Sequence, residues 1–118
     1  MALRQAEDSD WAAMFGMQPP ADWFGFVESS GWLVEGIGAV YRDTLGRWWL
    51  TFQRILAVGK VKTAHKSAKV LLAMARERGL EVRTIPDLRI DGAEMWIERL
   101  GFQKTDEQIE GQAVWLIQ

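Results

Sequence analysis

Cysteine is absent from this chain of 118 residues, and histidine and tyrosine occur only once each. Without thiols the chain cannot form a disulfide, use a thiolate nucleophile or build a cysteine-based zinc site. We therefore expect no metal site, and a reducing compartment such as the cytoplasm. The longest apolar run is far shorter than the ~20 residues that a membrane-spanning helix needs, so we expect neither a span nor a signal peptide.

Neither sign of charge is in large excess. Fourteen Lys and Arg residues against sixteen Asp and Glu residues give a net charge of −2, so the overall charge does not point to nucleic acid or to an anionic membrane. The length predicts a single domain, residues 1–118, around one core. Tryptophan is abundant, with seven residues. Because tryptophan is enriched at interfaces, some of these side chains are expected to contact a protein partner.

The first half of the chain predicts a strand, a helix and three further strands. Acidic residues at 7–10 suit the start of a helix, which should end near Gly16 because two prolines follow. Apolar residues then alternate with polar ones, which is typical of strands. We expect these strands at 24–28, 32–41 and 47–53, joined by short turns into an antiparallel meander.

The second half begins with a long helix at 59–78, predicted by an apolar stripe and by the C-terminal stop at Gly79. A strand at 81–85 should follow. Asp91 can then N-cap a short helix, with Glu94 at capping-box spacing, and Gly101 should end it in a left-handed conformation. A hairpin of 102–105 and 113–117 completes the chain.

Residues 96–102, WIERLGF, resemble the closing helix of the GNAT (GCN5-related N-acetyltransferase) superfamily. The predicted order of elements also resembles the order in that family over the whole chain. The resemblance implies an α+β fold in α/β/α layers, with a mixed, mostly antiparallel sheet, a long central helix and a C-terminal hairpin. It also implies that strands 47–53 and 81–85 are parallel and splay apart. Family members often carry a tyrosine, the general acid, where Ile97 stands here.

The same resemblance implies acetyl-CoA as a cofactor. In the family, a glycine-containing loop before the long helix binds the pyrophosphate through backbone N–H groups. At the matching stretch, 63–68, only Ala68 fits, and Lys66 stands where the first glycine belongs. Alternatively, a helix that starts at Gly59 would present two lysines near its N-terminus. The candidate cofactor-binding residues are Lys60, Lys62, Thr63, His65, Lys66, Ser67 and Ala68.

No residue can be assigned as catalytic from the sequence. His65 lies at the edge of an apolar stripe without an acidic neighbour within one turn, which favours packing over catalysis. Glu28, Glu35 and Tyr41 lie in predicted strands, where an ordinary outward-facing role is the simpler interpretation. Lys62, Lys66 and Lys69 share a helix face, either as a solvated surface or as a surface for phosphate or an acidic partner.

Two further stretches, VGKVKTAHK at 58–66 and RWWLTFQ at 47–53, resemble small GNAT-like proteins of short-tailed phages, including an internal virion protein family. This resemblance implies a fold retained for binding after the enzyme site decayed. The partner would be a second copy, a virion protein or a host protein, met in the host cytoplasm or the virion. The alternative is an active acetyl-CoA-dependent N-acetyltransferase with an atypical pyrophosphate loop.

The tryptophans divide into two predicted groups. Trp11, Trp32 and Trp96 occupy apolar positions of predicted elements and should be core residues. Trp48 and Trp49 are adjacent in one strand, so their side chains point to opposite faces of the sheet and only one can pack under the long helix. The candidate partner-binding residues are Trp23, Trp48 and Trp49.

Overall fold

The fold is built on one mixed sheet. The structure, a computed structural model, describes residues 2–30, 33–54 and 61–117. In this part of the chain a seven-stranded sheet has the order β1-β2-β3-β4-β5-β7-β6. All neighbouring strands are antiparallel except β4 and β5, which are parallel. The strands are β1 (Ala2–Gln5), β2 (Trp23–Ser30), β3 (Leu33–Arg42), β4 (Trp48–Arg54), β5 (Val82–Thr84), β6 (Gln103–Ile109) and β7 (Gln112–Ile117).

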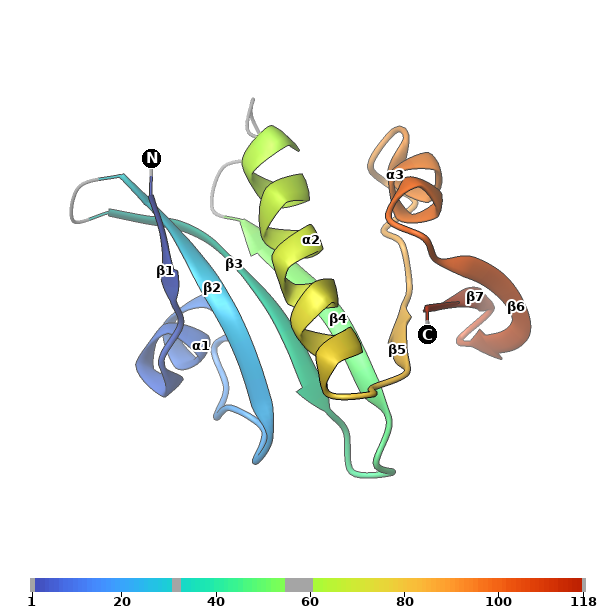
Figure 1. Cartoon of the computed structure of the whole chain (residues 1–118), viewed down its shortest axis with the longest axis horizontal. Coiled ribbons are helices and arrows are strands. Elements are labelled where there is room, and N and C mark those ends of the chain that lie inside the picture. The colour runs from blue at the N-terminus through green and yellow to red at the C-terminus, as the bar shows by residue number, and fades with distance from the viewer. Residues whose placement is uncertain (1, 31–32, 55–60, 118) are drawn as a thin grey trace.

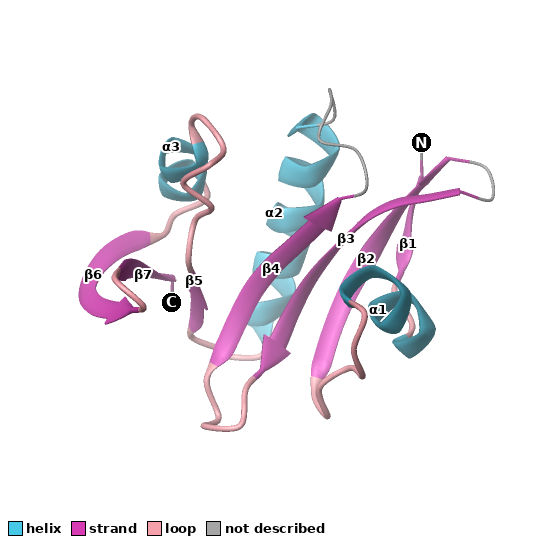
Figure 2. Ribbon diagram, turned by 180° about the vertical axis from the view of Figure 1, so that it is seen from behind, coloured by secondary structure: helices cyan, strands magenta, loops and turns pink. Residues whose placement is uncertain are grey.

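Two helices cover opposite faces of this sheet. Helix α1 (Asp8–Phe15) lies behind β2 and β3, and the long helix α2 (Val61–Glu77) crosses the front of β3 and β4 (Figures 1 and 2). The short helix α3 (Ala93–Arg99) follows β5. The α+β class and the mostly antiparallel sheet are therefore confirmed, as is the parallel pairing of the two strands that flank the long helix. None of the described helices is long and apolar enough to cross a membrane.

Helix α1 begins and ends where its sequence predicts. Glu7 and Asp10 form a reciprocal capping box, and Asp10 also accepts two hydrogen bonds of 2.8 Å from Arg4 in β1. Gly16 closes the helix with a φ of 68°, in the left-handed region that glycine adopts without strain. The helix is thereby fixed at both ends and linked to the edge strand.

The predicted start of α3 is wrong by one residue. Gly92, and not Asp91, is the N-cap, with a φ of 79° and no side-chain cap. This left-handed conformation favours glycine, so the chain turns at Gly92. Glu94 is therefore the second helical residue and falls short of capping-box spacing. The stop is as predicted, since Gly101 has a φ of 107°.

The main core lies between α2 and the sheet. Leu71, Val40 and Val82 are fully buried there, and Phe102 and Trp115 extend the same cluster toward the C-terminal hairpin. Helix α2 approaches the sheet closely over β3, because a Cβ on Gly38 would lie 2.6 Å from the Phe52 ring and 3.2 Å from Ser67 Oγ. The large side chain that packs against this glycine is therefore that of Phe52.

This packing predicts very different costs for two adjacent residues of α2. Leu71→Ala should lower the free energy of unfolding by about 2–5 kcal/mol, because it removes buried methyl groups and leaves a cavity. Val70→Ala should change it by less than about 1 kcal/mol, because Val70 is 38% exposed. Urea unfolding of both variants measures the difference. Equal effects at the two positions would contradict the orientation of α2.

Candidate functional site: the splay between β4 and β5

Strands β4 and β5 are held together over a short distance only. Their register consists of two pairs, Trp48 with Val82 and Trp49 with Arg83. One side-chain contact lies beyond these pairs, where Thr84 Oγ1 donates a hydrogen bond of 3.1 Å to the Leu50 carbonyl. β4 then continues to Arg54, whereas β5 ends at Thr84. We call the region beyond Leu50 and Thr84, where the strands separate in Figure 1, the splay.

The side chain of Trp96 bridges the splay. It comes from α3, and its ring centroid lies 5.5 Å from that of Phe52 on β4. Its indole Nε1 donates a hydrogen bond of 3.0 Å to His65 Nδ1 on α2. Trp96 is half-buried, and the next residue, Ile97, is 4% exposed in the main core. One aromatic side chain therefore connects the three elements that surround the splay.

This hydrogen bond determines which nitrogen of His65 carries the proton. A neutral imidazole has one N–H donor and one acceptor nitrogen. Since Nδ1 accepts from Trp96, the proton of the neutral ring is on Nε2. The lone pair of the neutral ring faces the indole, so in this arrangement His65 presents only its Nε2–H group, a hydrogen-bond donor, to other partners. Its contact with Trp96 supports the packing role that the sequence favoured.

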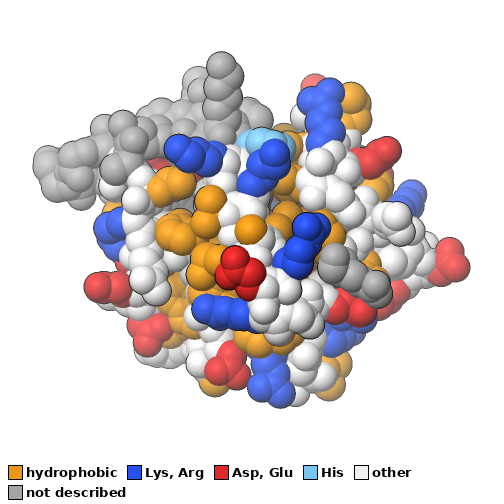
Figure 3. All heavy atoms as spheres, viewed as in Figure 1, with side chains coloured by type: hydrophobic (Ala, Val, Ile, Leu, Met, Phe, Trp, Pro, Cys, Tyr) orange, Lys and Arg blue, Asp and Glu red, His pale blue; other side chains and the backbone are white. Residues whose placement is uncertain are grey.

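The predicted cofactor-binding residues do not form one surface. Ser67 and Ala68 are 1% and 0% exposed, because they lie on the face of α2 that packs on the sheet. A ligand outside the helix does not reach these two side chains, so any cofactor contact at Ser67 and Ala68 would involve the backbone, and their cofactor role stays a prediction. Lys66 is exposed, as is Lys69 one turn later. Figure 3 shows several basic side chains on this face of the molecule. Lys60 and the side chains of Lys62 and Thr63 lie outside the described residues.

The three tryptophans predicted to contact a partner are all partly or wholly covered. Trp48 and Trp49 do point to opposite faces, but Trp49 is only 8% exposed and donates a hydrogen bond of 2.8 Å to Asp43. Trp49 therefore offers little exposed area to a partner, and its partner role stays a prediction. Trp48 is half-buried near Phe24, and Trp23 is half-buried with its indole bonded to Asp8. A partner role for these two remains a prediction.

Three other tryptophans, Trp11, Trp32 and Trp96, were predicted to lie in the core. Trp11, which belongs to α1, is 5% exposed, as predicted, and Trp96 is half-buried in the splay. Trp32 lies outside the described residues. Tyr41 packs beside Trp11, with ring centroids 5.6 Å apart, on the sheet face that α1 covers. The only tyrosine of the chain therefore lies across the sheet from Trp96 and His65.

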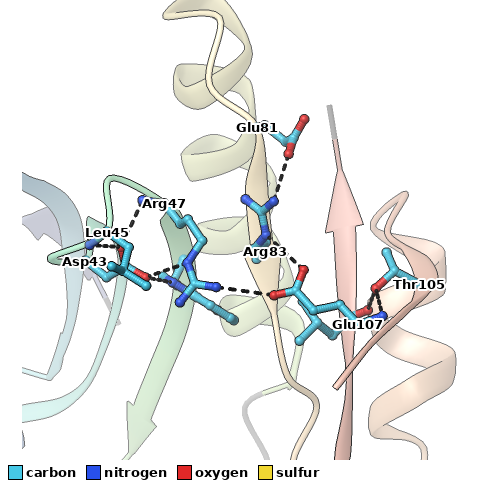
Figure 4. Close-up of polar contacts among 9 residues, drawn as sticks. Asp43, Leu45, Arg47, Glu81, Arg83, Thr105 and Glu107 are labelled. Atoms are coloured by element: carbon cyan, nitrogen blue, oxygen red, sulfur yellow. Dashed lines mark hydrogen bonds and ion pairs between the residues drawn. The ribbon is translucent and has the colours of Figure 1, made fainter. Parts of the chain in front are cut away.

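A polar network stabilises the closed end of the splay, the end where β4 and β5 are still paired (Figure 4). The sequence did not reveal this network. Asp43, in the turn between β3 and β4, accepts hydrogen bonds from Trp49, from the side chain and backbone of Arg47, and from the backbone of Leu45. Arg47 also reaches Glu107 on β6 at 3.3 Å. Arg83 on β5 lies 3.7 Å from the same carboxylate. The network thus connects the meander to both β5 and the C-terminal hairpin.

The pKa of Asp43 reflects this environment. Burial alone would raise the pKa, but the hydrogen bonds from Trp49, Arg47 and Leu45 favour the carboxylate and lower the pKa from 3.8 to about 2. A group with a lowered pKa stabilises the fold above its unfolded pKa, and this contribution is lost as the pH falls toward the folded value. Asp43 is therefore expected to contribute fully at neutral pH.

Asp43→Asn should lower the free energy of unfolding by about 2 kcal/mol at pH 7, because hydrogen bonds to a charged acceptor are replaced by weaker or mismatched ones. The difference between the two proteins should shrink as the pH falls from about 4 toward 2. Urea unfolding at several pH values measures this dependence. A difference that stays constant down to pH 2 would contradict the role of the carboxylate.

Ser67→Ala should stabilise the protein. The Ser67 hydroxyl is buried and has no hydrogen-bond partner among the described atoms, and a buried unsatisfied polar group costs about 1–3 kcal/mol. We expect the free energy of unfolding to rise by about 1 kcal/mol. Ser9→Ala on the exposed side of α1 is the control for helix propensity. A loss of stability in Ser67→Ala alone would mean that the hydroxyl is satisfied.

Comparisons with known proteins find solved structures of similar fold, although not of similar sequence. No protein-family model and no curated protein matches the sequence. A Klebsiella pneumoniae structure assigned as an acyl-CoA N-acyltransferase matches with a TM-score of 0.71 and 15% identity, over 98% of this chain and 94% of that chain.

Two similar structures contain a coenzyme. A Clostridium acetobutylicum protein predicted to be an acetyltransferase, solved with acetyl-CoA, matches with a TM-score of 0.65 and 14% identity, over 92% of this chain and 94% of that one. A Bacillus subtilis acetyltransferase in complex with CoA matches with a TM-score of 0.63 and 10% identity, over 97% and 95%. At these identities the likeness concerns the fold alone, and the chain has the GNAT acetyltransferase fold.

Proposed function

We propose that this GNAT-fold protein acts by binding a protein partner and not by acetyl transfer. The observation that carries the proposal is the closure of the splay by Trp96, which packs on Phe52 and donates a hydrogen bond to His65. A ligand arm between β4 and β5 would have to displace this ring. Function must be argued from such a site, because one fold supports many activities.

The residues beside Trp96 support the same proposal. The resemblance to the acetyltransferase family implies a tyrosine general acid at position 97, but Ile97 is apolar and buried in the core. His65 lies beside Trp96, and its acceptor nitrogen is already engaged by the indole. In this arrangement Ile97 has no proton to give to a leaving thiolate, and the engaged nitrogen of His65 is not open to take one from an amine acceptor.

The second candidate function is an acyl-CoA-dependent N-acyltransferase. It is favoured by the early separation of β4 and β5 after two residue pairs, and by two structures of the same fold that contain acetyl-CoA or CoA. In this alternative, Trp96 would move to line the cofactor arm. His65 would then offer its Nε2–H group to an acceptor oxygen of the cofactor.

The resemblance of residues 47–53 and 58–66 to GNAT-like phage proteins supports a more specific form of the main proposal. The partner would then be a virion protein, a host protein or a second copy of the chain. Because Trp48 and Trp49 are largely covered, the exposed side of α2 is the more accessible surface for such a partner.

Calorimetric titration with acetyl-CoA separates the two candidates. We expect binding weaker than about 1 mM, or about −4 kcal/mol, because Trp96 occupies the splay. Trp96→Ala should bind more tightly than the unmodified protein, since the obstructing ring is removed. Thermal unfolding should accompany the titration to confirm that the variant is folded.

A different set of results would support the acyltransferase. The unmodified chain would bind acetyl-CoA with micromolar affinity, Lys62→Glu would weaken this binding, and the acetyl group would be transferred to a primary amine. Lys66→Gly provides a further comparison, because it restores a glycine at the position where the family has one. Improved binding in that variant would support a decayed pyrophosphate loop.

A further inference from the structure

Two adjoining hollows lie beside α2, on the side that faces β7. The first is a cavity of about 170 Å³, and the second is a more open hollow of about 430 Å³. They share three lining residues, Arg76, Leu100 and Ile117, and so form one continuous depression. We call it the α2–β7 groove. It lies away from Trp96 and His65, which line neither hollow.

The charged side chains of the groove are all basic. Lys69 and Arg76 line the first hollow from α2, and Lys104 lines the second from β6. All three are exposed, and neither set of lining residues includes an aspartate or glutamate. This concentration contrasts with the net charge of −2 of the whole chain. Figure 3 shows basic side chains with apolar atoms exposed between them on this face.

Between these cations the wall of the groove is aliphatic. Leu72, Leu80, Leu100 and Ile117 line the first hollow, and each is half-buried, so part of each side chain meets solvent. A dry apolar cavity of about 150 Å³ can hold a benzene-sized group. The first hollow, of about 170 Å³, therefore has room for one leucine- or phenylalanine-sized side chain.

We propose that the α2–β7 groove binds an acidic segment of a protein partner. Carboxylates of the segment would pair with Lys69 and Arg76, which lie two helical turns apart, while an apolar side chain between them fills the cavity. Charge complementarity of this kind selects partners and accelerates their encounter. The inference rests on the proposed binding function and names the chemistry of the partner.

A protein segment fits the groove better than nucleic acid does. Phosphates could pair with the cations, but a sugar–phosphate backbone offers no aliphatic group for the leucine-lined cavity. A peptide that alternates acidic and apolar residues satisfies both parts of the groove at once.

Fluorescence anisotropy of labelled synthetic peptides tests the inference with the intact chain. The probes are a glutamate–leucine peptide, a lysine–leucine peptide and a glutamate–serine peptide of equal length, together with a single-stranded oligodeoxynucleotide. We expect the glutamate–leucine peptide to bind most tightly. Its affinity should fall about tenfold in the double variant Lys69→Glu, Arg76→Glu, and added salt should weaken binding by the unmodified chain.

The control variant reverses two charges elsewhere. Arg42→Glu with Arg89→Glu gives the same net charge, and both arginines are exposed away from the groove lining. Its affinity for the glutamate–leucine peptide should stay close to that of the unmodified chain. If the groove variant does not fold, the milder pair Lys69→Gln and Arg76→Gln should still show a smaller loss.

Several results would overturn the inference: no binding of the glutamate–leucine peptide, equal binding of any other probe, or equal losses in the groove and control variants. Acetyl-CoA titration of the same samples keeps the two proposals distinguishable. Tight acetyl-CoA binding with transfer refutes the proposed function, whereas a failure of peptide discrimination refutes only the groove.

Discussion

The short parallel contact between β4 and β5 is the constraint on which the rest of the structure depends. Two residue pairs and one threonine hydrogen bond join strands that must separate immediately afterwards. Backbone pairing between β4 and β5 alone therefore joins the C-terminal half of the chain only weakly to the meander. The Asp43–Arg47–Glu107 network reinforces the closed end, and Trp96 reinforces the splayed end through Phe52 and His65. Helix α2 contributes to the splayed end, since it carries His65.

Under the proposed binding function, these contacts give a reason why the splay is retained without transfer chemistry. In a fold that uses the separated strands to admit a cofactor, the side chain between them must leave room. Here an indole provides ring contacts and a hydrogen bond across the gap, so the same position stabilises the attachment of α3. Under the same proposal, the functional surface is the outer side of α2, where cations surround an apolar wall.

Local signals in the sequence were sufficient for most of the fold. The alternation in the meander, the apolar stripe of α2 and the glycines at 16, 79 and 101 act over a few residues, and each element appears close to where it was predicted.

The site was less predictable, because its contacts join distant residues. His65 meets Trp96 across 31 positions, and Arg47 meets Glu107 across 60. Alternation placed Trp48 and Trp49 on opposite faces, but only the Asp43 contact explains why Trp49 is buried. Similarly, the helix period alone did not separate buried Ser67 from exposed Lys66.

The central claim is that Trp96 closes the splay through its hydrogen bond to His65. Its most direct test is the nuclear magnetic resonance signal of the Trp96 indole N–H group, assigned by its loss in Trp96→Phe. The account predicts slow exchange of this proton with solvent, faster exchange in His65→Ala, and no shift of the signal when acetyl-CoA is added. Exchange as fast as that of an exposed indole, or a shift that saturates with acetyl-CoA, would contradict it.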